Sequence, residues 1–331
     1  MIGKYLSNTD YATLQDISIS NEFALYNLKQ MQICNKSIFV VFHGNTAIGI
    51  LNVSLIEGKY YSTYRQIDSK CIQKLFDDNS NVAFGCYENE SLIFDGESFY
   101  STETDLLFEN DFSGIDSIQL KPLEITYDQI SSTAGNNARS ISYSLADQMV
   151  IVPNTYKNSE GICWAASIAM KYNFENGYNK GLMGYVDAVN VYDCLKRELG
   201  YNPAGNTTCV KAGLGHFGMY DTYYKGDVSA TAVVAEIYND NPILASLKGT
   251  SDLTHTTIYH SVVICGVTYN SDDSAIYEIA DSNTTTIQLA YVDSNASSSS
   301  ADFIYSPDYL AEYYSWYQVY SYLPDNTHIT D

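Results

Sequence analysis

The first part of the chain alternates short runs of apolar residues with turn-forming residues. Two such runs, Ser37–His43 and Thr46–Ile56, are separated by Gly44-Asn45, which is the pattern of a β-hairpin. Residues 1–130 are therefore expected to form a small, β-rich α+β domain. The further elements predicted in it are strands at Lys59–Tyr64, Asn81–Tyr87 and Ser91–Phe94 and a short helix at Ser69–Asp77.

The pattern changes after this region. Ser131–Arg139 (SSTAGNNAR) is small and polar and has no periodicity, so residues 131–148 are predicted to be an exposed linker. From residue 149 on, apolar positions follow first a helical period and then a strand period, which predicts a second α+β domain over residues 149–331. Its predicted helices are Ile162–Phe174, Val186–Leu199 and Ala230–Tyr238, and its predicted strands are Ile243–Leu247, His260–Tyr269, Ala275–Ala280 and Tyr313–Leu323.

Charge narrows the range of partners. The 331 residues carry 39 Asp and Glu against 17 Lys and Arg, a formal net charge of −22. A surface this negative repels phosphate backbones, so the expected partner is a neutral or basic polypeptide substrate and not nucleic acid. No stretch reaches the roughly 18 apolar residues of a membrane span. Met1–Asp10 has no apolar signal core, so we expect either a cytoplasmic protein or, as we favour, a secreted or cell-surface one whose leader has been removed.

Cysteine usage gives no indication of a metal or cofactor site. The count is odd, which leaves at least one thiol outside any set of disulfides. No two cysteines have the Cys-x-x-Cys spacing of a zinc site, and no cofactor is expected. Most of the cysteines are expected to be small buried apolar side chains. The seven are Cys34, Cys71, Cys86, Cys163, Cys194, Cys209 and Cys265.

Cys163 has a different context, because it lies at the start of a predicted helix in the segment Glu160–Ser167 (EGICWAAS). The thiolate is the nucleophilic form of cysteine, and the amides of a helix N-terminus favour an anion. Gly161, two residues earlier, allows close approach of another chain. The pattern therefore indicates a nucleophile, and the competing interpretation is a buried structural cysteine.

This segment resembles the nucleophile segment of papain-like cysteine peptidases, whose pattern is Gly-x-Cys-Trp-Ala. The resemblance implies an α+β catalytic domain, with a helical part and an antiparallel sheet, in which Cys163 attacks peptide bonds. It also implies a histidine base at the head of a buried strand, and Tyr259–Val267 (YHSVVICGV) looks like that strand. We therefore expect His260 to be the base, at an interval from Cys163 similar to that in the bacterial staphopains. His255 is the rival, but it lies in a polar stretch with no strand to hold it.

A papain-like site also needs a side chain that orients the imidazole. The predicted strand Ala275–Ala280 should pair antiparallel with the His260 strand, and its far end would then return beside His260. Asp281 and Asn283 follow at that end, and residues two apart can face the same side of a strand. The family uses Asn in this role and some bacterial relatives use Asp. We expect Asp281, with Asn283 as the alternative orienter.

One position departs from the family pattern. The family has a Gln six residues before its nucleophile, where the side chain helps to bind the oxyanion, and this chain has Lys157 there. Asn158 is one residue closer and carries an amide, so we expect it to be the donor, with Asn154 as the other candidate. Loss of such a donor typically costs about 2.7–4 kcal/mol of transition-state stabilisation. The departure is therefore also compatible with a degenerate enzyme.

The arrangement of the whole chain resembles that of streptopain-type zymogens, in which a pro-region precedes the catalytic domain. The resemblance implies that residues 1–130 inhibit the second domain by covering its cleft until the linker is cut. For these residues the alternative is an independent binding module. The predicted function is a cysteine endopeptidase made as a zymogen. The alternatives are a papain-like amidase or transamidase acting on cell-wall or other amides, and a catalytically degenerate binding protein.

Overall fold

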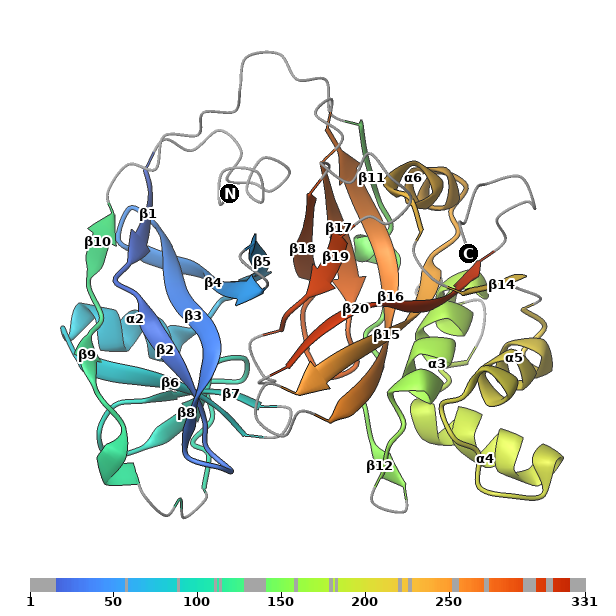
Figure 1. Cartoon of the computed structure of the whole chain (residues 1–331), viewed down its shortest axis with the longest axis horizontal. Coiled ribbons are helices and arrows are strands. Elements are labelled where there is room, and N and C mark those ends of the chain that lie inside the picture. The colour runs from blue at the N-terminus through green and yellow to red at the C-terminus, as the bar shows by residue number, and fades with distance from the viewer. Residues whose placement is uncertain are drawn as a thin grey trace.

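The computed structural model describes residues 16–56, 59–87, 90–109, 112, 115–127, 141–157, 160–178, 181, 184–219, 222–225, 228–251, 256–270, 274–293, 302–307 and 312–321. This part of the chain contains five α-helices and a large curled sheet, so its fold is of the α+β class (Figure 1). None of the helices in these ranges is long and apolar enough to cross a membrane.

The described residues 16–127, here called the N-terminal block, are mostly β-structure. The predicted hairpin pairs β3 with β4 through a turn in which Gly44 has a φ of 55°, and β6 pairs with β7 as predicted. The predicted helix is present as α2, where the Ser69 hydroxyl caps the Ile72 amide. The elements are β1 (Ile17–Ser20), β2 (Phe23–Asn27), β3 (Gln32–His43), β4 (Thr46–Ile56), β5 (Lys59–Gln66), α2 (Lys70–Asp77), β6 (Asn81–Tyr87), β7 (Glu90–Phe94), β8 (Phe99–Ser101), the 3-10 turn Ile115–Ser117, β9 (Lys121–Pro122) and β10 (Ile125–Tyr127).

In the remaining residues the five long strands and β19 follow the helices, as the sequence predicts, but the short strands β11, β12 and β13 precede α3 and β14 lies between α5 and α6. The elements are β11 (Ile141–Ser144), the 3-10 turn Ala146–Gln148, β12 (Tyr156–Lys157), β13 (Glu160–Gly161), α3 (Cys163–Glu175), α4 (Ala188–Leu199), α5 (Thr207–His216), β14 (Thr222–Lys225), α6 (Ala230–Tyr238), β15 (Ile243–Ser251), β16 (Thr257–Tyr269), β17 (Ala275–Ala280), β18 (Gln288–Asp293), β19 (Asp302–Tyr305) and β20 (Glu312–Ser321). The sequence did not predict α5 or the strands β11 to β14, β18 and β19.

Strands β15 to β20 close into a ring. Each strand pairs antiparallel with the next one along the chain, and β20 returns to pair with β15. Helices α3, α4 and α5 lie together on one side of these strands (Figure 1). A large hydrophobic core, which includes Met170 from α3 and Val263 from β16, joins the helices to the ring. This shared core holds the helices in a defined position relative to the ring.

Helix α3 is central because it is buried on nearly all sides. Ala165, Ala166 and Ala169 are fully buried, and such small side chains let the helix approach its neighbours closely. The buried Lys171 ammonium is held by the Asn241 side chain and the Pro242 carbonyl, both at 2.7 Å. These bonds connect the helix to the turn that precedes β15. The start of α3, where Cys163 lies, is thereby set against the ring.

The segment predicted as a linker, 131–148, is partly a strand of the sheet. Ile141–Ser144 form β11, which pairs antiparallel with β16 of the ring. The small polar residues of the sequence suggested an exposed connection, but the backbone at 141–144 adds to an available edge of β16. Residues 131–140 lie outside the described residues.

The N-terminal block joins the ring by strand pairing. β5 runs antiparallel to β18, with Arg65 opposite Gln288 and Thr63 opposite Ala290. A small hydrophobic cluster contains residues from both sides, among them Tyr64 and Ile276. Figure 1 shows the block on the side of the ring opposite to α3, α4 and α5.

Candidate active site

Cys163 is the first residue of α3 and is half-buried. The short hairpin of β12 and β13 leads directly into it. The first amides of an α-helix have no partner inside the helix, and the helix dipole favours a negative charge at this end. The position therefore favours a negative charge, such as that of a thiolate on Cys163 or of an oxyanion bound beside it.

His260 lies on β16 and is 4% exposed, and Asp281 follows the last residue of β17 and is fully buried. The antiparallel register of the two strands, with Val263 opposite Ala280, brings Asp281 back to His260. The Nε2 atom of His260 lies 2.8 Å from Oδ1 of Asp281. The structure thus places together the two residues that the sequence predicted as base and orienter.

The pKa of His260 reflects its surroundings. Burial disfavours the charged imidazolium and lowers the pKa, but the Asp281 carboxylate and a hydrogen bond with the Cys163 side chain outweigh burial. The net result is a pKa raised from 6.5 to about 10. Since Nε2 faces Asp281, the ring nitrogen left for Cys163 is Nδ1. The imidazole ring also packs on Tyr314, with the ring centroids 5.4 Å apart.

The Asp281 carboxylate has two further donors. The backbone amide of Asn283 donates to Oδ1 at 2.9 Å, and the hydroxyl of the fully buried Tyr305 donates to Oδ2 at 2.7 Å. A buried carboxylate needs such donors to stay charged. The role of Tyr305 was not predicted, because its only signal in the sequence is an aromatic residue at the end of the short apolar run Phe303–Tyr305.

Asn283, the alternative orienter, supports the carboxylate through its backbone. Its side-chain oxygen accepts a hydrogen bond from Nδ2 of Asn154 at 2.9 Å. The backbone amide of Asn154 donates to the carbonyl of Ser282 at 2.7 Å. Asn154, the second candidate for an oxyanion donor, is therefore bound to the segment that carries Asp281.

The expected oxyanion donor, Asn158, lies outside the described residues, as does His255, the rival base. Lys157, which stands in the family's Gln position, points its ammonium toward α4, with Nζ 3.8 Å from Asp193 Oδ1. The same atom lies 6.0 Å from the centre of the Tyr192 ring. The oxyanion assignment therefore stays a prediction, and Lys157 has a structural partner instead.

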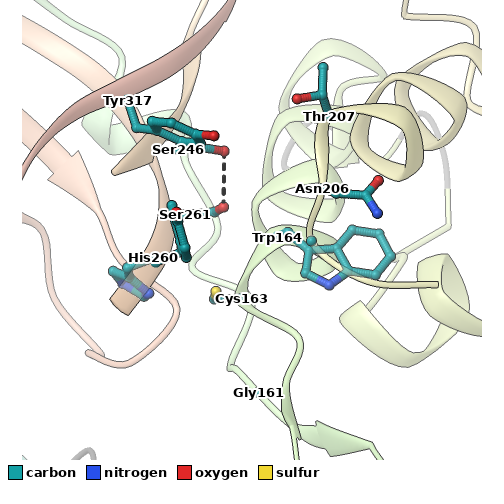
Figure 2. A pocket seen from close by; sticks show the side chains of 11 residues that line it. Gly161, Cys163, Trp164, Asn206, Thr207, Ser246, His260, Ser261 and Tyr317 are labelled. Carbon is teal, nitrogen blue, oxygen red and sulfur yellow. Dashed lines mark hydrogen bonds between the residues drawn. The ribbon is translucent and has the colours of Figure 1, made fainter. Parts of the chain in front are cut away.

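A pocket of about 420 Å³ opens beside Cys163, between the start of α3 and the ring. Figure 2 shows Cys163 facing His260 across it, with Trp164 on the helix side and Tyr317 on the strand side. No Asp, Glu, Lys or Arg of the described residues lines the pocket. Its wall comes from Gly161, Cys163, Trp164, Gly205, Asn206 and Thr207 on one side and Ser246, Tyr259, His260, Ser261 and Tyr317 on the other.

The sequence indicated Cys163 and His260 but not how the two walls of the pocket are packed. Gly205 lies so close to Trp164 that an added Cβ would be 2.8 Å from Cδ1 of the indole. On the other side, the hydroxyls of Ser246 and Ser261 lie 3.3 Å apart on paired strands. All lining residues belong to 161–317, so no described residue of the N-terminal block reaches the pocket.

The site brings a cysteine sulfur together with an imidazole whose pKa is raised (Figure 2). No group of three or more His, Cys, Asp or Glu in the described ranges is arranged to hold a metal ion. The pocket offers room for a side chain of a substrate next to the sulfur. Acyl transfer to Cys163 is therefore the reaction that the geometry supports best.

A scan of the chain against protein-family models gives no match, and a search of curated proteins gives none either. The function must therefore be argued from the site.

Proposed function

We propose that the chain is a papain-like cysteine endopeptidase in which Cys163 is the nucleophile, His260 the general acid and base, and Asp281 the residue that orients the imidazole. One observation carries the proposal. Cys163 begins a helix and faces His260 (Figure 2), whose Nε2 lies 2.8 Å from the buried carboxylate of Asp281. Nucleophile, base and orienter in this order make up the arrangement used for covalent catalysis.

In the proposed reaction the Cys163 thiolate attacks the carbonyl carbon of a peptide bond. The imidazolium of His260 gives its proton to the leaving amine, and a thioester remains on the sulfur. The neutral imidazole then takes a proton from water, which attacks the thioester. The carboxylic acid product leaves and the thiolate and imidazolium are restored.

The surrounding fold supports a papain-like assignment. A helix that begins with the nucleophile faces a closed ring of antiparallel strands that holds the base and the orienter. This is the division into a helical part and an antiparallel sheet that the resemblance implies. Division of the chain into an N-terminal domain and a catalytic domain, and a secreted or cell-surface location, stay predictions.

The inhibitory role predicted for residues 1–130 has no support from the described residues. The pocket is lined only by residues 161–317, and the N-terminal block contacts the ring through β18. Inhibition of the site by residues 1–130 therefore stays a prediction.

The test is covalent labelling of the full-length chain with an epoxide inhibitor of cysteine peptidases, followed by mapping of the adduct by mass spectrometry. We expect one adduct, on Cys163, and none in a Cys163→Ala variant. Cys194→Ala and Cys209→Ala are the controls and should label like the parent. An unmodified Cys163 in folded parent protein contradicts the proposal and favours the degenerate binding protein. A labelled chain that cuts no polypeptide but cleaves or exchanges cell-wall or other amides points to the amidase or transamidase alternative.

A further inference from the structure

The N-terminal block is hydrogen-bonded to the segment that follows Asp281. Both the backbone amide and the hydroxyl of Thr285 donate to Oε2 of Glu103, each at 2.9 Å. Glu103 belongs to the block, and its other carboxylate oxygen lies 3.6 Å from the buried Arg65 guanidinium on β5. Arg65 is fixed in turn by a 2.9 Å hydrogen bond to Thr102. The carboxylate that holds Thr285 is therefore itself held in place.

The segment between Asp281 and Thr285 is a tight turn. The amide and the hydroxyl of Thr284 both lie 3.1 Å from the Asp281 carbonyl, to which they donate. Thr284 is buried, and its hydroxyl is also 2.9 Å from the Thr286 carbonyl. Because this turn has little freedom, a restraint on Thr285 is also a restraint on Asp281.

A second contact reaches Asp281 from the other side. Tyr305, which donates to Oδ2 of Asp281, is followed by two residues that the N-terminal block holds. The amide of Ser306 donates to Thr63 Oγ1 at 3.3 Å, and its hydroxyl lies 3.0 Å from that of Ser54. The ammonium of the buried Lys36 donates to the carbonyl of Pro307 at 2.6 Å.

We propose that the N-terminal block is a permanent part of the working site, which positions Asp281 through Glu103 and Thr285 on one side and through Ser306 and Tyr305 on the other. This inference rests on the proposed function of Asp281. It assigns to the block the opposite role from a removable inhibitor. The pairing of β5 with β18 and the shared cluster of Tyr64 and Ile276 make the contact continuous with the fold.

The first test measures the His260 titration by NMR in full-length protein, which requires neither substrate nor turnover. His260 is faced by the Cys163 side chain from α3, the Asp281 carboxylate after β17 and the Tyr314 ring from β20. A carboxylate that can move away from the imidazolium stabilises it less. Glu103→Ala should therefore lower the pKa of His260 by about one unit, and the uncharged change Thr285→Val should lower it less.

Matched variants separate positioning from general damage. Thr285→Ser keeps both hydrogen-bond donors, so its His260 should titrate as in the parent. Glu97→Ala removes an exposed glutamate of the same block and is the matched control for Glu103→Ala, so it should leave the His260 pKa unchanged. In an Asp281→Asn background, Glu103→Ala should cause no further shift, because its effect passes through Asp281. A shift that persists in that background would reveal a direct charge effect and overturn the inference.

The outcomes also separate this inference from the proposed function. If Cys163 is labelled by the epoxide but Glu103→Ala and Thr285→Val leave the His260 titration unchanged in folded protein, the block does not position Asp281 and the inference is wrong. If the titration shifts as described but Cys163 is not labelled, the positioning stands and the peptidase assignment falls.

Discussion

At the scale of single residues, the site depends on the buried carboxylate of Asp281. Asp281 is fully buried, and the groups around it that stabilise a carboxylate are the imidazole of His260, the amide of Asn283 and the hydroxyl of Tyr305. In such surroundings an ion pair is much stronger than at the surface, provided that both partners keep their positions. The raised pKa of His260 is the consequence that can be measured.

Asp281→Asn should move the pH dependence of turnover. Without the carboxylate, burial disfavours the imidazolium with less opposition, so the pKa of His260 falls from about 10. The leaving amine needs the imidazolium proton, so the alkaline limb of kcat/KM should move to lower pH and kcat should fall roughly 10²-fold or more. Asp16→Asn, at an exposed position, is the control. An unchanged alkaline limb in Asp281→Asn would falsify the assignment of Asp281 as the orienter.

The same shift has a consequence for stability. A group whose pKa is raised by folding stabilises the folded chain fully below its ordinary pKa, and the contribution is lost as the pH rises through the folded value. For His260 that window runs from 6.5 to about 10. The free energy of unfolding of the parent should therefore decrease across this range more steeply than that of a His260→Gln variant, as measured by urea titrations at several pH values.

Part of the site was visible in the sequence because its residues carry local signals. Cys163 has a motif around it, and His260 heads a long apolar run that can only be a buried strand. Asp281 follows from simple strand pairing. Tyr305, Glu103 and Thr285 have no such signal, because their role depends on contacts between segments that are far apart in the chain, such as the 182 positions between Glu103 and Thr285.

At the scale of elements, strongly periodic segments were predicted well. Helices α3, α4 and α6 and strands β15, β16, β17 and β20 all begin and end within a few residues of the predicted bounds. Helix α5 was missed because Gly213 and Gly215 interrupt its pattern. Gly213 is needed there, since an added Cβ would lie 2.6 Å from Ile168 of α3. The pairing of β5 with β18 could not be predicted, because nothing local indicates which edges meet.

Two glycines near α5 provide a test of how the pocket wall is packed. Gly205→Ala would place a Cβ 2.8 Å from the Trp164 ring, so we expect a loss of about 1–3 kcal/mol in the free energy of unfolding and slower labelling of Cys163. Gly215→Ala is the control, because its Cβ meets open space in a helix and should stabilise by about 0.5–1 kcal/mol. Equal stability of the two variants, measured by urea unfolding, would show that the wall at Trp164 is not tightly packed.

At the scale of the whole molecule, the described chain behaves as one connected structure. The N-terminal block pairs with the ring through β18, on the side opposite to α3, α4 and α5 (Figure 1). The pocket lies between the start of α3 and the ring strands β15, β16 and β20. No described residue of the block lines the pocket beside Cys163. The zymogen arrangement inferred from the order of the segments therefore stays a prediction, which the contacts of the described residues do not support.

The intact chain should consequently react without processing. Full-length protein that migrates as a single uncut species should be labelled at Cys163 at the same rate before and after long incubation. The measurement is the time course of epoxide labelling, read with gel electrophoresis of the same samples. Labelling that begins only after the chain is cut near residues 131–140 would support self-inhibition instead.

The central claim is tested most directly by hydrolysis of an unfolded polypeptide by the full-length chain, with the products analysed by mass spectrometry. The account predicts internal cuts, with each pair of fragments heavier than the parent segment by one water, and no cuts with the Cys163→Ala protein. Folded parent protein that leaves the polypeptide intact, or a Cys163→Ala variant that cuts it equally well, would contradict the account.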